Sequence, residues 1–294
     1  MNNRNDKPVV VGIDGSSSAV HAVRWAAAEA HRRRTGLHVV FSDVASLVYL
    51  PERPMVALPD SYSAAVQRQA RGWLEQAQDV ANREAPAVDV DTAIRAGAPE
   101  SVLISESQTA QLVVVGSRGL GGFTGLIVGS VAVALAGHAH CPVAVVRGPE
   151  IAVADAPVVV GVDGSRGAET ALTCAFEAAA MRGVGLRAVH TWYSVVGDET
   201  WDSQQAGGGW ASVQADEERL LAELLSGWSE KYPDVDVRRF VTRDKPARAL
   251  LEHAKHAQLV VVGARGRGGF TGLMLGSTSQ QLVYHSPCPV IVAR

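Results

Sequence analysis

Aspartates and glycines at repeated positions are the residues of this chain best suited to chemistry. Asp14 and Asp163 each follow a short apolar run, PVVVGI in the first half and PVVVGV in the second. A carboxylate placed there can accept hydrogen bonds from a ribose hydroxyl or a nucleobase. A second repeated run, AQLVVVG, leads each time into a glycine-rich segment. Its glycines can adopt positive φ and let backbone amides approach a ligand closely. The two patterns together predict one ligand site in each half.

The glycine-rich segments have the same spacing in both halves. Each reads Gly, two residues, Gly, nine residues and then Gly-Ser, at Gly116, Gly119, Gly129 and Ser130, and again at Gly263, Gly266, Gly276 and Ser277. Both serines are expected to cap a helix, whose unpaired amides and positive dipole end suit a phosphate group. Arg118 and Arg265, inside the segments, have guanidinium groups that suit the β or γ phosphate.

A purely structural alternative stays open. Asp14 and Ser16 would then only cap the following helix, and the glycines would only form turns. Six glycines between 116 and 129, all of which recur in the second half, are more than a turn requires and favour a site. No GxxxxGK[ST] is present, which excludes a P-loop, and GxGxxG fails at Thr124.

The other residues able to bind metals or react are predicted to be structural. His138 and His140 have no histidine counterpart in the second half, and His253 with His256 is expected on an exposed helix surface. None of the three cysteines belongs to a CxxC pair, and all are expected to pack: Cys141, Cys174 and Cys288. The basic cluster 32–34 is expected to complement the end of a helix.

The elements around these residues alternate between strand and helix. In the first half, strands are expected at 9–13, 37–42, 88–94, 112–115 and 143–146, and helices at 17–34, 62–84, 99–108 and 130–138. In the second half, strands are expected at 158–162, 186–191, 235–242, 259–262 and 290–292. Continuous apolar strands between helices predict parallel sheets covered on both faces. The offset between repeats predicts two domains, 1–147 and 157–294, joined by a linker at 148–156.

Composition excludes several classes of protein. The chain has 294 residues, 47% hydrophobic and 19% charged, with a formal net charge of −3, which is typical of folded globular domains. It lacks the long basic run that would indicate a nucleic-acid surface. Neither a run of about 20 apolar residues nor a secretory signal is present, so no membrane span is expected and the cytoplasm is the predicted location.

With these motifs, the chain resembles a tandem member of the universal stress protein family, over nearly its whole length. The family's nucleotide-binding subclass carries G-x2-G-x9-G-[ST], which this chain satisfies twice. The resemblance implies two Rossmann-like α/β domains, each with a five-stranded parallel sheet in the order 3-2-1-4-5. It also implies ATP, with Mg2+, at the carboxyl edge of each sheet.

The resemblance further implies roles for individual residues. Asp14 and Asp163 would contact the adenosine portion, backbone near Ser42 and Thr191 would contact the adenine, and the glycine segments would hold ribose and phosphates. Their neighbours complete the predicted binding set: Gly15, Val131, Gly164 and Thr278. The halves differ at Gly97/Asp244, Ser117/Ala264 and Leu120/Arg267, which predicts unequal affinities.

Three functional classes remain on this sequence. The leading one is a regulatory stress-response protein that binds ATP and hydrolyses it slowly at most, because no positioned base or metal-binding carboxylates are found in the glycine segments. The second is a low-turnover ATPase or kinase-like enzyme, and the third an interaction scaffold with vestigial sites. Family members commonly pair domains through the last strand, which implies an internal pseudo-dimer and is compatible with a further homodimer. The segments 45–60 and 194–210 are variable and could carry partner specificity.

Overall fold

The computed structural model describes all residues except 1–6, 45–59, 120–127, 148–154, 193–208 and 268–273. Residue contacts divide the chain into two compact units. The first comprises Met1–Glu150 with Pro289–Val292 and Arg294, and the second comprises Ile151–Cys288 with Ala293. Each unit is an α/β structure, as the sequence predicts.

The first unit is built on parallel strands in the order β3-β2-β1-β4-β5. Its strands are β1 (Val9–Ile13), β2 (Leu37–Asp43), β3 (Val90–Ala96), β4 (Leu112–Gly116) and β5 (Val143–Val146). β10 (Val290–Ala293), whose first three residues are grouped with this unit, runs antiparallel beside β5. The predicted order 3-2-1-4-5 is confirmed here.

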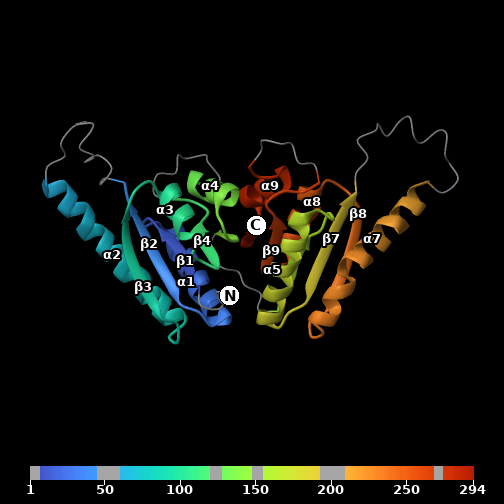
Figure 1. Ribbon diagram of the computed structural model, residues 1–294, viewed down its shortest axis with the longest axis horizontal. Helices are drawn as coiled ribbons and strands as arrows, with labels where there is room; N and C mark the ends of the chain where they lie inside the picture. The colour runs from blue at the N-terminus through green and yellow to red at the C-terminus, as the bar shows by residue number, and fades with distance from the viewer. Residues whose placement is uncertain (1–6, 45–59, 120–127, 148–154, 193–208, 268–273) are drawn as a thin grey trace. The chain divides into compact units, whose positions relative to one another are not determined.

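Four helices cover the two faces of this sheet (Figure 1). They are α1 (Ser17–Arg33), α2 (Asp60–Glu84), α3 (Pro99–Glu106) and α4 (Ser130–His138). α1 packs against α2, and α3 packs against α4. Strand β1 shows why both faces must be covered: Val9 and Val11 are fully buried, and the alternate residue Gly12 approaches Leu103 of α3.

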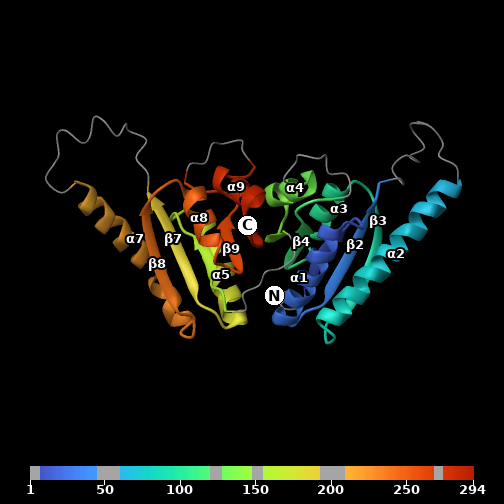
Figure 2. The same ribbon diagram turned by 180° about the vertical axis from the view of Figure 1, so that it is seen from behind.

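The second unit repeats this pattern with the strand order β8-β7-β6-β9, all parallel. Its strands are β6 (Val158–Gly161), β7 (Leu186–Trp192), β8 (Val237–Arg243) and β9 (Leu259–Gly263). Its helices are α5 (Arg166–Arg182), α7 (Gly209–Lys231), α8 (Pro246–Ala254) and α9 (Ser277–His285). Figure 2 shows α7 alongside β8, the strand at the border of this sheet.

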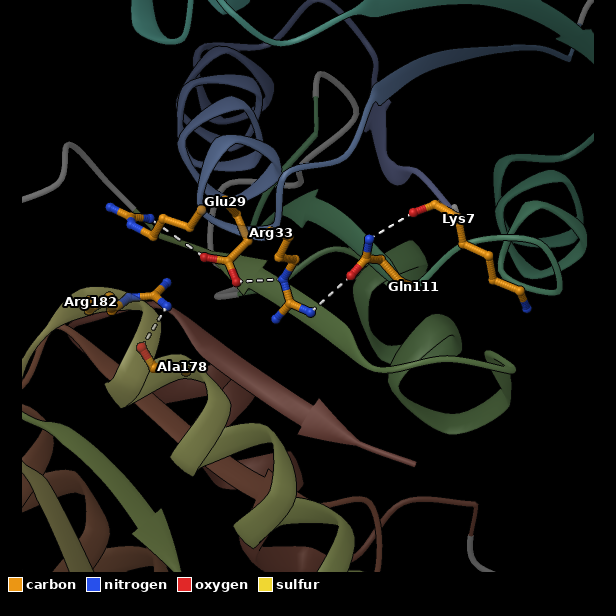
Figure 3. A network of polar contacts seen from close by, with 7 residues as sticks. Lys7, Glu29, Arg33, Gln111, Ala178 and Arg182 are labelled. Atoms are coloured by element: carbon orange, nitrogen blue, oxygen red, sulfur yellow. Dashed lines mark hydrogen bonds and ion pairs between the residues drawn. The ribbon is translucent and has the colours of Figure 1, made fainter. Parts of the chain in front are cut away.

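Two arginines of the basic cluster at the end of α1 form ion pairs with a buried carboxylate. Glu29 is fully buried, and its Oε1 accepts a hydrogen bond from Nε of Arg33 at 2.7 Å, with Arg32 at 3.5 Å from Oε2. Arg33 also donates to Gln111, which in turn donates to the backbone carbonyl of Lys7, as Figure 3 shows. The structural interpretation of these arginines is confirmed.

Two strand boundaries differ from the prediction for one physical reason. β3 begins at Val90 rather than Val88, and β8 begins at Val237 rather than Val235. Val88 and Val235 are buried, but each donates its amide to a residue three positions earlier, in the turn after the preceding helix. An apolar residue can therefore belong to the core without belonging to the strand.

Candidate nucleotide site

The candidate site in the first unit lies where β1 and β4 end. These strands pair in parallel, so Asp14, after β1, and Gly116, the last residue of β4, reach the same sheet edge. The loop after β4 returns toward Asp14, because a Cβ atom added to Gly119 would lie 2.5 Å from Asp14 Oδ2. Any side chain at this position would displace the carboxylate. The sequence prediction that these residues meet is therefore what the fold produces.

The second unit has the same arrangement after β6 and β9. A Cβ atom on Gly266 would overlap with Oδ2 of Asp163. The backbone N–H of Arg267 donates to that same oxygen at 2.9 Å. The glycine segment thus brings a backbone amide onto the aspartate, the kind of close approach that favours glycine at this position.

Both aspartates also organise the start of the following helix. Asp14 Oδ1 accepts from the N–H of Ser16 at 3.0 Å, and Asp163 Oδ1 accepts from the N–H of Ser165 at 3.0 Å. The hydroxyls of Ser16 and Ser165 cap α1 and α5 by accepting from Ala19 and Ala168. The structural alternative therefore accounts for these serines and for one oxygen of each aspartate. It does not account for the glycine contacts at the other oxygen.

A backbone hydrogen bond joins the two described ends of each glycine segment. Gly129 donates its amide to the carbonyl of Ser117 at 2.9 Å, and Gly276 donates to that of Ala264 at 2.8 Å. Gly116 lies against the first turn of α1, where a Cβ atom would be 2.5 Å from Ser18 Oγ. None of the described glycines of the two segments has the expected positive φ; at this edge it is found instead at the glycines after the aspartates, Gly15 at +85° and Gly164 at +73°.

Ser130 and Ser277 do not have the predicted capping role. The N-caps of α4 and α9 are Gly129 and Gly276, and each serine is the first residue of its helix. The reason is that the glycine carries the extended backbone (ψ about 150°) with which the loop enters the helix. The hydroxyl of Ser130 points elsewhere and donates to Glu100 Oε1 of α3 at 3.2 Å.

The remaining predicted residues surround this edge. Ser42, near the end of β2, donates its hydroxyl to the carbonyl of Gly97 at 2.6 Å. Thr191 lies one residue before the end of β7 and is half-buried. Arg118 and Arg265 are exposed, whereas Val131 and Thr278 are half-buried in the first turns of α4 and α9. These residues fall in described parts of the chain, whereas Leu120, Thr124 and most of the variable segments 45–60 and 194–210 lie outside them.

Two residues at this edge, Trp73 and Glu100, were not predicted from the sequence as members of the site. The indole ring of Trp73, on α2, lies against Gly15 and packs on Phe41 at 5.6 Å between ring centroids. In the second unit, Nη2 of Arg267, which the comparison of the two halves had singled out, lies 2.6 Å from the place of a Cβ on Gly164. The prolines that open α3 and α8 were the available signal for Glu100, since they place the next residue in the first turn.

A second cation stands beside Arg118. The amide of Ser117 donates to the carbonyl of Val146 at 2.8 Å, which brings Arg147 close to the glycine segment. Burial, and then the nearby charge of Arg118, lowers the pKa of the Arg147 guanidinium. Positive charge therefore gathers where the resemblance places phosphates.

Histidines and cysteines take structural roles, with one difference from the prediction. His138 Nδ1 lies 2.9 Å from the carbonyl of Ala134 in its own helix. His256 is exposed as predicted, but His253 is half-buried and packs on Phe240 at 4.7 Å between centroids. All three cysteines are buried. Within the described ranges there is no group of three or more His, Cys, Asp or Glu suited to a metal ion.

Comparison with known proteins identifies the family. A model of the universal stress protein family matches residues 6–147 and again 156–294. A universal stress protein of Mycolicibacterium smegmatis is 41% identical over 296 residues, with 97% of this chain and 96% of that protein covered. One from Mycobacterium tuberculosis is 40% identical over 295 residues, with the same coverage. This chain belongs to the universal stress protein family.

A solved structure supports the same fold. A universal stress protein from Archaeoglobus fulgidus superposes with a TM-score of 0.71 at 20% identity, covering 100% of this chain and 99% of that one. No helix in the described ranges has both the length and the apolar character needed to cross a membrane.

Proposed function

We propose that this protein is a cytoplasmic regulatory protein of the stress response that binds ATP, with Mg2+, at one site in each domain. The proposed domains are 1–147 and 157–294, around a linker at 148–156. The observation that carries the proposal is the repeated contact between a glycine and an aspartate, Gly119 with Asp14 and Gly266 with Asp163. A side chain at either glycine would fill the space beside the carboxylate, and a bare backbone leaves donors for a ligand.

The residues divide the proposed binding between them. Asp14 and Asp163 would accept hydrogen bonds from the adenosine portion. The amides of the glycine segments and the first turns of α4 and α9 would hold phosphates, with Arg118 and Arg265 adding charge. Mg2+ would enter with the phosphate oxygens, the ligands it prefers.

Regulation rather than rapid catalysis fits the role of the aspartates. Each carboxylate accepts a hydrogen bond from the turn that follows it, from Ser16 in one unit and from Ser165 in the other, and Asp163 also accepts one from Arg267 of the glycine segment. Under this proposal both aspartates are committed to the adenosine end of the ligand, away from the γ phosphate where a catalytic base would act. We therefore propose slow hydrolysis at most. A low-turnover ATPase or kinase-like enzyme and a scaffold with vestigial sites are the alternatives.

The test is chemical identification of any nucleotide carried by the purified protein. Denaturing release followed by chromatography is applied to the wild type and to the Asp14→Ala/Asp163→Ala variant. ATP that is released by the wild type and lost in the variant supports the proposal. A protein that is empty and also shows no thermal stabilisation by added Mg-ATP contradicts it, since a ligand that binds the folded state must stabilise it.

We also propose that the two domains form a pseudo-dimer through their last strands, 143–146 and 290–292. The antiparallel register of Val290 with Val145 and of Val292 with Val143, within the first compact unit, supports this. A further homodimer is compatible with it. Light scattering on the whole chain distinguishes one copy from two.

A further inference from the structure

We propose that Glu100 makes the first site the weaker of the two for triphosphates, so that the second domain holds the stronger ATP site. The inference deepens the proposed function and rests on it. It assigns to Glu100 the discrimination between nucleotides with many phosphates and nucleotides with few.

A carboxylate stands at the phosphate end of the first site. Glu100 lies in the first turn of α3, is half-buried, and accepts a hydrogen bond from Ser130 Oγ at 3.2 Å. Ser130 is the first residue of α4, which packs against α3. Glu100 therefore accepts the hydrogen bond that the Ser130 hydroxyl could otherwise donate to a phosphate. Its negative charge also repels a phosphate placed there.

The second unit has no such carboxylate at the equivalent place. α8 begins with Pro246, as α3 begins with Pro99, and the next residue is Ala247. Ala247 can neither accept a hydrogen bond nor carry charge. Ser277, which leads α9 as Ser130 leads α4, has no carboxylate partner from that position.

At the carboxyl edge, the second unit also carries more positive charge than the first. Three described positions that are uncharged in the first half carry cations in the second, in the pairs Ser17/Arg166, Ala96/Arg243 and Ala98/Lys245. The first turn of α5, which holds Arg166, touches the glycine segment, because a Cβ on Gly167 would lie 2.5 Å from the carbonyl of Arg265. Two changes oppose this trend, since Asp244 replaces Gly97 and Thr242 replaces Arg95, but Asp244 is within 3.6 Å of Arg248. The balance favours polyphosphate at the second site.

The expected size of the effect follows from Coulomb's law. Two unit charges about 4 Å apart in bulk water change an equilibrium constant by about fivefold, and by more where water is partly excluded. Removal of the Glu100 charge should therefore tighten ATP binding at the first site by about fivefold or more. AMP, with its single phosphate near the ribose, should change less.

The experiment is calorimetric titration of the full chain with ATP and with AMP, in Mg2+. Glu100→Ala and Glu100→Gln are made in a Gly266→Val background, which disables the second site, and Ala247→Glu in a Gly119→Val background. The glutamine keeps an acceptor for Ser130 without the charge. We expect both Glu100 variants to tighten ATP, and Ala247→Glu to weaken it. Glu75→Ala, an exposed charge on α2, controls for net charge.

The outcomes separate the two proposals. If ATP binds the wild type but the Glu100 variants bind it no more tightly than their parent, the role of Glu100 is wrong and the nucleotide function stands. If only Glu100→Ala tightens ATP, the hydrogen bond rather than the charge is responsible, and the electrostatic proposal is overturned. If no variant and no wild-type chain binds nucleotide, the proposed function itself fails.

Discussion

The indole ring of Trp73 fills the space that a side chain at Gly15 would need, immediately after the aspartate of the first site. Gly15 has a φ of +85°, so this position combines a left-handed backbone with a face covered by an aromatic ring. Trp73 lies on α2 and also packs on Phe41 of β2. The helix therefore helps to fix the backbone that presents Asp14.

Substitution of Gly15 by alanine should destabilise the protein more than a left-handed backbone alone explains. We expect Gly15→Ala to lower the free energy of unfolding by about 1 kcal/mol for positive φ and by roughly 1–3 kcal/mol more for displacement of the ring. Gly183→Ala is the matched control, because Gly183 has a φ of +64° and nothing within 4 Å of an added Cβ. Urea denaturation measures both variants. Equal losses would mean that the contact with Trp73 contributes nothing.

Substitution of Gly119 by alanine should weaken nucleotide binding at the first site. The added methyl group displaces the Asp14 carboxylate, and the loss of one hydrogen bond to a charged group, worth roughly 1.5 kcal/mol, weakens nucleotide binding at the first site by about tenfold. Gly72→Ala is the control, because a Cβ on this exposed helical glycine meets nothing within 4 Å. Titration with Mg-ATP in the Gly266→Val background measures the change. Unaltered affinity would remove Asp14 from the proposed site.

Glu29 should be important for stability although it lies outside the site. Replacement by glutamine leaves Arg33, which is 12% exposed, without its charged partner. We expect a loss of about 3 kcal/mol in the free energy of unfolding, because breaking a buried pair strands one charge. Asp216→Asn breaks an exposed pair with Arg219 and should cost less than about 0.5 kcal/mol. Similar losses in the two variants would contradict this account.

The buried thiols should be unreactive at ordinary pH. Burial raises the pKa of Cys141 to about 12 and that of Cys288 to about 11, from 9.0. At pH 8 we expect a thiol reagent to modify neither residue in the folded protein and to modify them once the chain is unfolded. Since both values are raised, the protonated thiols stabilise the fold fully below pH 9. This contribution is lost as the pH rises through 11 and 12. Modification of the folded protein at pH 8 would contradict the prediction.

The sequence predicted the architecture because the two halves reinforce each other. Continuous apolar runs such as 9–13 and 112–115 mark buried parallel strands, and their repetition fixes the alternation with helices. Boundaries were harder to predict where an apolar residue is buried in a turn. Val88 and Val235 pack into the core but hydrogen-bond within the turn after a helix, and no local pattern separates these two cases.

The site could be predicted in part. Asp14, Gly119 and their counterparts were found because repeated motifs point to the same sheet edge. Trp73 and Glu100 were missed, because each reaches the edge from a helix whose orientation depends on tertiary packing. The cap of α4 was misplaced by one residue, since both Gly129 and Ser130 are acceptable N-cap types and only the backbone decides between them.

The contact between Gly119 and Asp14 also constrains how the two copies can diverge during evolution. A side chain at Gly119 forces the Asp14 carboxylate to move, so replacement of the glycine is sterically easier after Asp14 has become a smaller residue. The reverse order carries no steric penalty. A decaying copy should therefore lose its aspartate first, and this chain, with both pairs intact, has taken neither step.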